Sequence, residues 1–532
     1  MHRKGKSASL FIIVALIIGM IASGCSKTTG STGTASRVTL NMFMGNSGLE
    51  YPDGVDPSSN PFIDVVKNYA NVNLKLEVPG YQDFKTKLDL LLASGKLPDL
   101  VHSWYPDEME SAADQGAFID LKKYYDNSPI VQKVVTPQMM ELAKSQSGHY
   151  YRIPMAWDKA PQGSGLIVRY DLVEKYNNGK WPETVDEWVN LMRKIHQAEP
   201  DSTVLSNRVV NDYGLTYGGT VIYNMFGAAP YSYRVQEGKV VSTFELPEYR
   251  QATILMKQLY DEGILDKEFA TNDLNAWNEK RFNKNVLMEW DSADQLVPNA
   301  QKAWLGQENP GTKTWKLAFA PALKQYPTDP KYVWPNKSLP INTHGIYISS
   351  SSKNPDQAWK VIEGFASDQL KEDIFWGKEG DTYTVKDGVR IPNAEKLADP
   401  NRTWSLQLAI LFGFVDGQDV KSALAKQVMG PEYSKFVNDS IQPIGDMATK
   451  KGYLLSGFFK ASNEADKKTP ESRQFITQAT VEAIMGKITM EEFDQRVAQF
   501  KQKYGFIYDE MTKFMNDNKD DLRKKGVVEV DW

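Results

Sequence analysis

Apolar residues follow two alternating patterns along the chain, and together they predict strands and helices in turn. From Val38 to Met44 an apolar residue recurs at every second position, which predicts a strand. Asn60-Pro61 predicts a helix start, with an Asn cap and Pro in the first helical position. Residues 74–78 predict a second strand, residues 83–95 a second helix, and Asp99 begins a third strand. This order predicts right-handed crossovers and a mostly parallel sheet.

A second stretch of the same kind begins near Leu166-Ile167-Val168. The sequence from Thr184 to Glu187 is a T-x-x-E capping box, and helices are predicted at 247–262 and 354–368. The C-terminal part is predicted to be helical, with another capping box from Thr489 to Glu492. No internal repeat of solenoid length is present. The pattern therefore predicts two α/β units.

The first 25 residues have the pattern of a secretory signal. A basic start and an apolar run from Leu10 to Ile21 lead to small residues and then to Cys25, the only cysteine. The run is shorter than the ~20 apolar residues of a membrane span. The segment resembles a bacterial lipoprotein box, in which the cysteine receives a diacylglycerol. We therefore expect a signal peptide at 1–24 and a lipidated Cys25 that opens a flexible tether at 25–36. An ordinary signal peptide or an uncleaved anchor is the alternative.

Charge and cysteine content narrow the function classes. The chain carries 62 Lys+Arg and 67 Asp+Glu, a net charge of −5. Cleavage removes Arg3, Lys4 and Lys6, so that the basic count falls from 62 to 59 and the net charge becomes −8. A mildly acidic chain does not indicate a nucleic-acid partner. With Cys25 lipidated, the folded part has no thiol, which excludes disulfides, thiol catalysis and cysteine metal ligands.

Several segments, in order along the chain, carry a family resemblance. They are Phe84–Val101 (FKTKLDLLLASGKLPDLV), Gly116–Leu121 (GAFIDL), Tyr150–Pro154 (YYRIP), Leu166–Leu172 (LIVRYDL), Trp181–Trp188 (WPETVDEW), Leu259–Asp266 (LYDEGILD) and Gly377–Gly388 (GKEGDTYTVKDG). Together they resemble the extracellular solute-binding proteins of bacterial ABC importers, in the large lipoprotein branch that serves oligosaccharide uptake. Arg152 replaces a glycine that is usual in the third segment.

The resemblance implies a two-lobed α/β fold of the type II periplasmic-binding-protein kind, with discontinuous lobes around a cleft and hinge. The chain would cross between lobes about three times, near 155–160, 338–344 and 378–384. The expected N-terminal lobe comprises 37–156 plus 340–380. The expected C-terminal lobe comprises 157–339 plus 381–532. A Pro-rich surface excursion is expected from Tyr326 to Leu339.

Sugar recognition uses aromatic faces and polar side chains in a cleft, and the chain has 13 Trp, many beside polar residues. Parallel sheets present ligand sites at the carboxyl ends of their strands. The predicted ligand-binding residues follow predicted strands or lie near the expected crossings: Asn46, Trp104, Tyr105, Tyr151, Trp157, Asp158, Arg169, Trp290, Asp291, His344, Trp376 and Glu379.

Several of these residues have an equally ordinary structural interpretation. Trp104, Trp157 and Trp290 fit a cleft wall or a core equally well. For Arg169 a pair with Asp171 is the favoured alternative to ligand binding, and a lone histidine such as His344 is more often structural. Trp181 and Trp188 are predicted to pack a helix, outside the ligand site.

No enzyme motif is present. The sequence contains no G-x-S-x-G, H-E-x-x-H, Walker loop or G-x-G-x-x-G, and its five histidines are scattered. We therefore expect no catalysis and no cofactor. A glycosidase needs only two carboxylates, for which Asp158, Glu289 and Asp291 are candidates, so a surface lipoprotein glycosidase or lyase stays as an alternative.

No metal site is expected either. Some members of the branch carry a calcium loop that corresponds here to residues 198–204, which lack its repeated Asp/Asn and its glycine. Asn516, Asn518 and Asp520 alternate but lack the turn glycine and the closing carboxylate.

The expected function is capture of an oligosaccharide by a monomer anchored at the outer face of the cell membrane. The protein would deliver its ligand to ABC permease subunits. A sugar receptor for a membrane sensor is a further alternative. Arg152 and Lys159 would suit a sugar carboxylate.

Overall fold

The computed structural model describes residues 37–145, 147–156, 163–211, 213–283, 286–306, 309–323, 341–409, 411, 418–529 and 531–532. It separates Met1–Arg37 from a compact unit, Val38–Trp532, to which the following description refers. The predicted signal peptide, Cys25, the tether and the Pro-rich excursion lie outside the described residues.

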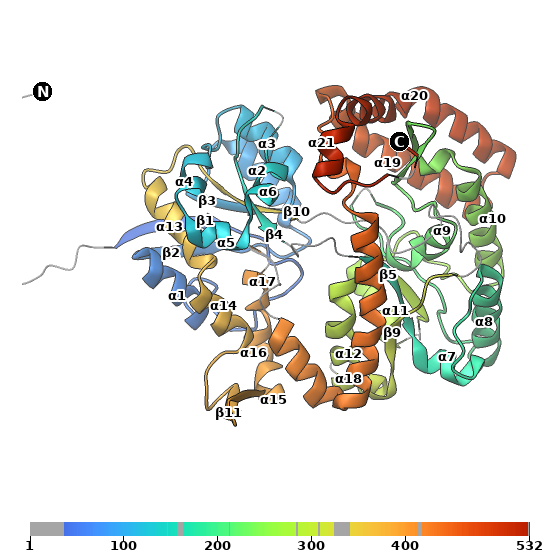
Figure 1. The fold of residues 1–532 in the computed structure, drawn as a ribbon, viewed down its shortest axis with the longest axis horizontal. Coiled ribbons are helices and arrows are strands. Elements are labelled where there is room, and N and C mark those ends of the chain that lie inside the picture. The colour runs from blue at the N-terminus through green and yellow to red at the C-terminus, as the bar shows by residue number, and fades with distance from the viewer. Residues whose placement is uncertain are drawn as a thin grey trace, which may run out of the picture. The chain divides into compact units, whose positions relative to one another are not determined.

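The first half of this unit is built on a five-stranded sheet in the order β2-β1-β3-β10-β4 (Figure 1). β1 pairs in parallel with β2 and β3, as the sequence predicts, whereas β10 runs antiparallel to β3 and β4. The elements of this half are β1 (Val38–Phe43), α1 (Pro61–Ala70), β2 (Val72–Glu77), α2 (Phe84–Ser94), β3 (Leu100–Ser103), α3 (Pro106–Asp114), α4 (Lys122–Asp126), α5 (Pro129–Val134), α6 (Pro137–Leu142), β4 (Ile153–Ala156), β10 (Ile341–Ile348), α13 (Pro355–Phe365), α14 (Asp368–Phe375), β11 (Tyr383–Lys386), β12 (Val389–Pro392), α15 (Ala394–Leu397), α16 (Pro400–Thr403) and α17 (Leu406–Ala409).

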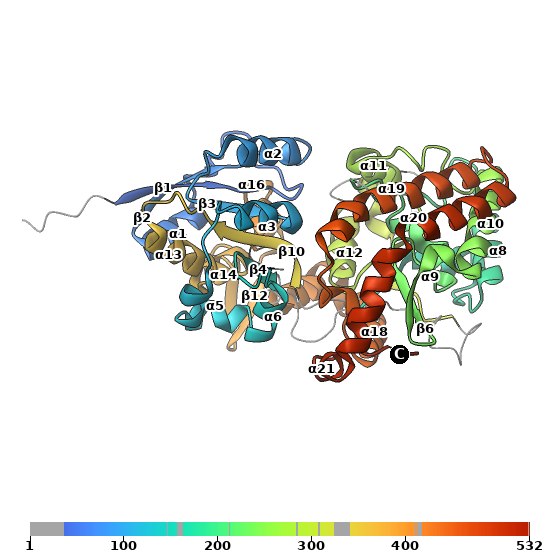
Figure 2. The ribbon, with the colours of Figure 1, turned by 90° about the horizontal axis from the view of Figure 1, so that it is seen from above.

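Helices cover both faces of this sheet (Figure 2). Alternate strand residues such as Met42, Leu100 and Ile346 pack with α1 and α13 in one core. Their neighbours, such as Val101 and Tyr347, pack with α2 and α3 in a second cluster on the other face. Because both faces are covered, the loops at the strand ends are left to carry polar chemistry.

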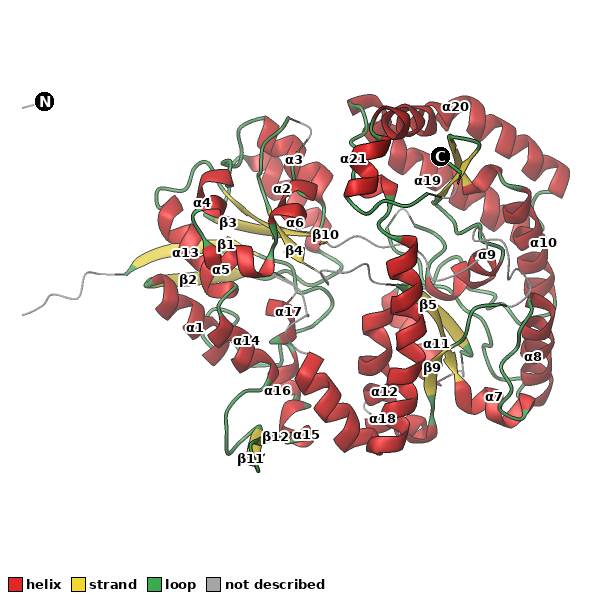
Figure 3. Cartoon of the chain, in the orientation of Figure 1, coloured by secondary structure: helices red, strands yellow, loops and turns green. Residues whose placement is uncertain are grey.

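The second half is mostly helical around a three-stranded sheet, β8-β5-β9 (Figure 3). Both outer strands run antiparallel to β5, so the parallel arrangement of the first sheet is not repeated. Its elements are β5 (Ser164–Arg169), α7 (Tyr170–Asn177), α8 (Val185–Ala198), η1 (Tyr217–Thr220), α9 (Val221–Met225), β6 (Tyr233–Gln236), β7 (Lys239–Ser242), η2 (Thr243–Glu245), α10 (Pro247–Asp261), α11 (Leu274–Asn283), β8 (Met288–Ser292), η3 (Ala293–Gln295), α12 (Leu296–Leu305), η4 (Pro310–Thr314), β9 (Leu317–Phe319), η6 (Leu455–Gly457), α19 (Asn463–Ile484), α20 (Met490–Asp517) and α21 (Lys519–Lys524).

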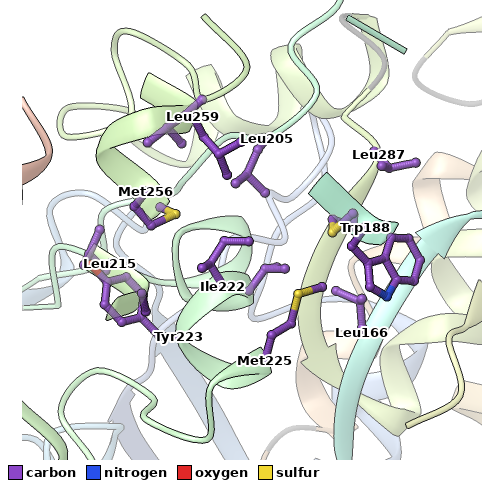
Figure 4. Packing of buried hydrophobic residues seen from close by; sticks show 14 of the residues in the cluster. Leu166, Trp188, Leu205, Leu215, Ile222, Tyr223, Met225, Met256, Leu259 and Leu287 are labelled. Carbon is purple, nitrogen blue, oxygen red and sulfur yellow. The ribbon is translucent and has the colours of Figure 1, made fainter. Parts of the chain in front are cut away.

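A large core, beside smaller clusters, fills the described part of the second half. Leu166 of β5, Trp188 of α8 and Met225 of α9 pack together in it (Figure 4). Trp188 is fully buried and Trp181 packs against the same cluster, which confirms the predicted packing role of both tryptophans.

The helix ends follow the predicted chemistry. The Asn60 side chain accepts hydrogen bonds from the Phe62 and Ile63 amides, and the Gly95 cap of α2 adopts a left-handed φ of 63°. Thr489 and Glu492 form the complete predicted capping box. Thr184 caps α8 by accepting from the Glu187 amide.

The chain passes between the two halves after β4, after β9 and along α18 (Gln418–Lys451). Val420 of α18 belongs to the first core, whereas Ala425 and Met429 belong to the second. The third crossing therefore lies within a helix, beyond the 378–384 region expected from the sequence. Residues after 380 stay with the first half because Trp404 packs on Tyr51 at 4.6 Å between ring centroids.

Candidate functional site

One edge of the five-stranded sheet gathers four of the predicted residues. β1 and β3 end at this edge, and β10 begins there because it runs antiparallel to β3. Asn46 follows β1, Trp104 and Tyr105 follow β3, and His344 lies in the first half of β10. We refer to this set of strand ends, with the loops that follow, as the first edge.

Trp104 is the centre of an aromatic cluster at the first edge. Its ring stacks on Phe84 with centroids 3.9 Å apart and lies 5.9 Å from Tyr81 at an interplanar angle of 18°. A Cβ added to Gly45 would lie 2.0 Å from the indole, so only glycine permits this approach of the β1 loop. Trp104 is half-buried, with one side held by Phe84.

Two histidines support the indole. The Nε2 atom of His102 lies 3.1 Å from Nδ1 of His344, and the His344 ring lies 5.4 Å from Trp104. Burial lowers the pKa of His102 well below its usual range. Burial, with a contribution from the Arg152 guanidinium, lowers the pKa of His344 to about 4. Both imidazoles are therefore neutral at neutral pH.

Asn46 is 2% exposed, and its polar atoms are used within its own loop. Its side-chain amide donates to Glu50 at 2.9 Å, and its oxygen accepts from the Gly48 amide at 3.0 Å. Asn46 thus shapes the loop at the first edge.

A second group of polar and aromatic side chains lies in the second half. Trp290 and Asp291 end β8 and pair in register with Leu166 and Gly165 of β5. Near them, Tyr217 of η1 stacks on Trp277 of α11 with ring centroids 5.7 Å apart. We call the end of β8, together with η1, α11 and the loop that carries Arg208, the second edge.

Tyr217 is the most constrained residue of the second edge. It has a left-handed φ of 43°, which is uncommon for a residue with a side chain. Its hydroxyl accepts a hydrogen bond from Arg208 at 3.3 Å. Burial, together with the charge of Asp291, raises its pKa to about 12. The phenol therefore stays protonated and remains a donor.

A buried ion pair lies beside Tyr217. Arg281 donates to Glu289, whose side chain is almost completely buried. Burial raises the pKa of Glu289, although the Arg281 charge opposes the rise. Arg208 also donates to the Tyr81 hydroxyl at 3.4 Å, which joins a side chain of the first edge to one of the second.

Four predicted residues lie elsewhere. Tyr151 precedes β4 and therefore lies at the opposite edge of the sheet, near His149. Arg169 is at the far end of β5 from Asp291 and pairs with Asp171 at 2.6 Å, as its structural interpretation predicts. Trp376 is buried in the first core and donates to Asp419 at 2.8 Å, and Glu379 is exposed in a turn. The structure does not bring these four to either edge.

The remaining sequence hypotheses concern the first crossing and the Arg152 side chain. Trp157, Asp158 and Lys159 lie outside the described residues. Arg152 is 6% exposed and donates to the carbonyl groups of Asn342 and Thr343, so its guanidinium is committed to the backbone before His344. Arg152 therefore acts on the first edge through β10.

A surface pocket of the described residues lies away from both edges. It has a volume of about 790 Å³ and contains none of the predicted residues. Its lining comes from α12, η4, α15, α16 and α18 and from the turns beside α15: Trp304, Lys313, Ala394, Glu395, Lys396, Ala398, Asp399, Pro400, Gln427 and Val428.

Sequence reasoning did not identify Tyr81, His102, Arg208, Tyr217, Trp277 or Arg281. Tyr81 and His102 could have been found, since they adjoin predicted strand ends. Tyr217 had only a weak signal, the Tyr-Gly-Gly sequence at 217–219, and Arg208 and Arg281 had none.

Within the part of the chain that the structure describes, no three His, Cys, Asp or Glu side chains are grouped as metal ligands. In the same residues, no helix combines the length and apolar character needed to cross a membrane.

Comparison with known proteins gives a consistent result. Residues 57–372 match the family described as bacterial extracellular solute-binding protein. The chain is 25% identical over 528 residues to the lipoprotein LipO of Bacillus subtilis, covering 94% of this chain and 96% of LipO. It is 21% identical over 513 residues to the polygalacturonan/rhamnogalacturonan-binding protein YtcQ of the same organism, covering 93% and 96%.

A solved structure has the same fold. The Streptococcus pneumoniae ABC-transporter substrate-binding protein FusA, in complex with kestose, aligns with a TM-score of 0.64 at 17% identity. The alignment covers 91% of this chain and 100% of FusA. The two α/β halves are thus the two lobes of the solute-binding-protein fold, which confirms the fold class predicted from the sequence.

Proposed function

We propose, because the chain belongs to the bacterial extracellular solute-binding proteins, that it captures an oligosaccharide outside the cell and delivers it to an ABC permease. The relatives support this choice of ligand class. YtcQ is named for binding polygalacturonan and rhamnogalacturonan, and FusA was solved with kestose. Both names specify sugar polymers or oligomers, of which one kind is acidic and the other neutral.

The observation that carries the proposal is the composition of the two edges. The first presents the half-buried indole of Trp104 beside the neutral imidazole of His344. The second presents Trp290, Asp291 and the Tyr217 phenol. Aromatic faces with a few oriented hydrogen-bonding groups are what a sugar requires.

We assign the ligand to the residues of these edges. The first edge supplies Trp104, Tyr105, His344 and Tyr81, with Asn46 holding its loop. The second supplies Trp290, Asp291, Tyr217, Trp277 and Arg208. Trp157 and Asp158 remain part of the prediction, because they follow β4, which ends at the first edge.

Capture would proceed by hinge closure of the two halves around the sugar. The three passages between halves are the natural hinge, and α18 contains a break at Gly430, whose φ of 77° and ψ of 160° are not helical. Pro431 follows it, and a residue before proline avoids the helical region. Since Ala425 and Met429, which precede this break, already pack in the second core, a rotation that spares both cores would fall between Val420 and Ala425.

We further propose that the mature protein begins at Cys25, carries a lipid on that residue and acts as a monomer at the outer face of the cell membrane. The Ser/Thr/Gly-rich segment 25–36 would give the folded unit freedom to reach the permease. A Cys25→Ser variant should be recovered in the soluble extracellular fraction, whereas the parent chain should stay with membranes.

The proposal is tested by thermal unfolding of residues 37–532 with two trisaccharides, kestose and trigalacturonate, and with analysis of the sugar afterwards. A ligand at a hundred times its dissociation constant adds about 2.7 kcal/mol of stability. A shift with the sugar intact supports a binding protein. Cleaved sugar would replace the proposal with a glycosidase or lyase, and no shift with either sugar would count against this ligand class.

A further inference from the structure

The first edge contains two histidines from strands that are distant in the sequence. His102 of β3 pairs in register with Ile346 of β10, and His344 lies two residues earlier on β10. Since side chains two apart on a strand point to the same face, both imidazoles lie on one face of the sheet. Their rings meet through a hydrogen bond of 3.1 Å between Nε2 of His102 and Nδ1 of His344.

The direction of this hydrogen bond follows from a third group, the backbone amide of Gly45. This amide is buried and donates to Nδ1 of His102 at 3.4 Å. An amide N–H can only donate, so Nδ1 of His102 must carry a lone pair. A neutral imidazole has one proton, which therefore lies on Nε2 of His102 and is donated to Nδ1 of His344.

The same reasoning applies to His344. Its Nδ1 atom accepts from His102, so its single proton lies on Nε2. The order Gly45 N–H to His102 to His344 thus fixes both tautomers and leaves an N–H donor at the end of the chain. No described residue is recorded as accepting a hydrogen bond from that nitrogen.

The surroundings keep His344 neutral and hold its backbone in place. The Arg152 guanidinium donates to the carbonyl groups of Asn342 and Thr343, and Glu110 lies 3.9 Å from Arg152. The His344 amide donates to the Asn342 side chain at 2.7 Å. The positive charge of Arg152 disfavours a second proton on His344, so the ring is held as a donor through Nε2.

Burial distinguishes the two rings. His102 is fully buried, whereas His344 is half-buried and lies 5.4 Å from the Trp104 ring. The donor at the end of the chain is therefore beside the aromatic face on which a sugar ring would stack.

We propose that Nε2–H of His344 donates a hydrogen bond to an acceptor oxygen of a sugar unit stacked on Trp104, and that His102 is the positioning residue that fixes this donor. This inference rests on the proposed sugar-binding function. The group that this donor recognises is a sugar oxygen with a free lone pair, either a hydroxyl or a carboxylate oxygen. The neutral His344 ring can donate to either one without gaining or losing a proton.

The first test is independent of any sugar. Two-bond ¹H–¹⁵N correlation spectra of the ¹⁵N-histidine-labelled Val38–Trp532 unit report which ring nitrogen carries the proton. His102 and His344 should both show a bare Nδ1 and a protonated Nε2 at neutral pH. A proton on Nδ1 of His344 would overturn the assignment. In His102→Leu, the His344 signals should become those of a tautomer mixture, while His102→Gln, which can accept from Gly45 and donate to His344, should restore the single form.

The second test measures affinity for kestose and for trigalacturonate by titration calorimetry. His344→Leu should weaken binding of whichever trisaccharide binds by about tenfold, the loss expected when one hydrogen bond worth about 1.4 kcal/mol is removed. His344→Gln retains an N–H donor and should lose less. His102→Leu should weaken binding several-fold and His102→Gln should recover it. The matched control is His149→Gln, since His149 is exposed and pairs with Asp120 at 2.8 Å.

The two tests separate the possible failures. Unchanged affinity in His344→Leu, with normal thermal unfolding, would overturn the donor role. If the parent protein binds neither trisaccharide, the proposed function fails for these sugars, and the tautomer spectra alone decide whether the fixed donor exists.

Discussion

The two edges reach a similar composition by different physical routes. The first is built from strand ends, so that Trp104, His102 and His344 are positioned by the register of β3 and β10. The second is built from loops, a short η1 turn and a helix, which are held by a network of buried polar groups. The comparison teaches that strand register can supply most of the positioning of an uncharged site, whereas a charged site on loops needs its own network of buried polar groups.

The scaffold of the second edge is centred on Asn207, Asp266 and Lys280. Asn207 donates to the carbonyl groups of Gly214 and Phe269 and accepts from the Thr216 amide. Lys280 of α11 donates to Asp266 at 2.7 Å, and both side chains are nearly buried. These bonds tie the loop before Tyr217 to the helix that carries Trp277.

The largest effect on the free energy of unfolding is therefore expected from a substitution that breaks this network of buried polar groups. Lys280→Met leaves the Asp266 carboxylate buried without its cation, and removing one partner of a buried pair costs about 3–5 kcal/mol. Urea unfolding should show this loss. The matched control is Lys316→Met, whose pair with Glu174 is about 40% exposed on both sides and should contribute about 0–1 kcal/mol. If both variants lost the same free energy of unfolding, the buried Lys280–Asp266 pair would contribute no more to the second edge than an exposed ion pair does.

The next effect concerns the turn that holds Tyr217. A Cβ on Gly218 would lie 2.0 Å from the Ser206 carbonyl oxygen, which belongs to the backbone and cannot move aside easily. Gly218→Ala should cost about 1–3 kcal/mol of stability, the usual cost of overpacking. It should also weaken binding of the trisaccharide that the parent binds. Gly80→Ala at the first edge meets no atom within 4 Å and serves as the control. A harmless Gly218→Ala would show that the Tyr217 turn tolerates displacement.

The contrast also explains what the sequence could predict. Strand ends are visible as breaks in an alternating pattern, and Asn46, Trp104 and Tyr105 do follow β1 and β3 in the structure. Tyr151 was predicted within a strand at the first crossing, and in the structure it lies just before β4, at the opposite edge of the sheet. Arg208 and Arg281 could not be found, since their position depends on hydrogen bonds between segments that no local pattern encodes.

The prediction of domain boundaries from the sequence was limited for the same reason, because packing between distant segments is not visible in a local pattern. The first two passages were expected near 155–160 and 338–344, and in the structure they come after β4 and after β9. The third depends on Trp404 and its neighbours packing into the first core, and on α18 carrying residues of both cores. Neither fact follows from apolar periodicity, which reports that a face is buried but not against which partner.

A third, smaller effect is the pH dependence of stability, which is expected to differ between the groups of the two edges. The pKa of His344 is lowered to about 4 and that of His102 is lowered well below its usual value near 6.5. Between these values the unfolded chain binds more protons than the folded protein, so stability should fall as pH drops from 6.5 towards 4 and be fully present above 6.5. The pKa of Asp266, which supports the second edge, is also lowered, but by a different cause. Burial alone would raise it, and hydrogen bonds from Lys280 and other donors outweigh burial. Its contribution is thus lost only below the usual Asp value of about 3.9.

The measurement is the unfolding midpoint as a function of pH for the parent and for the His102→Gln/His344→Gln double variant. The variant should lose less stability as the pH drops below 6.5, and the two curves should become parallel only once both histidines are protonated in the folded protein. Glu289, whose pKa is raised by burial, is present in both proteins and cancels in the difference. Parallel curves across the whole range would show that the two histidines have the same pKa values in the folded and unfolded chain. Burial would then not be what keeps them neutral at the first edge.

The smallest effect concerns the hydrogen bond that joins Tyr81 of the first edge to Arg208 of the second. Tyr81 stacks on Trp104, and its hydroxyl accepts from Arg208 at 3.4 Å, a long bond. Tyr81→Phe keeps the ring and should change stability and trisaccharide affinity by less than about 0.5 kcal/mol, below the usual net worth of a hydrogen bond. Tyr81→Ala removes the ring contact and should cost about 0.5–1.5 kcal/mol. If Tyr81→Phe were as damaging as Tyr81→Ala, the hydroxyl would outweigh the ring. The first edge would then depend on the charged groups of the second, and the division between a sheet-positioned edge and a scaffolded one would not hold.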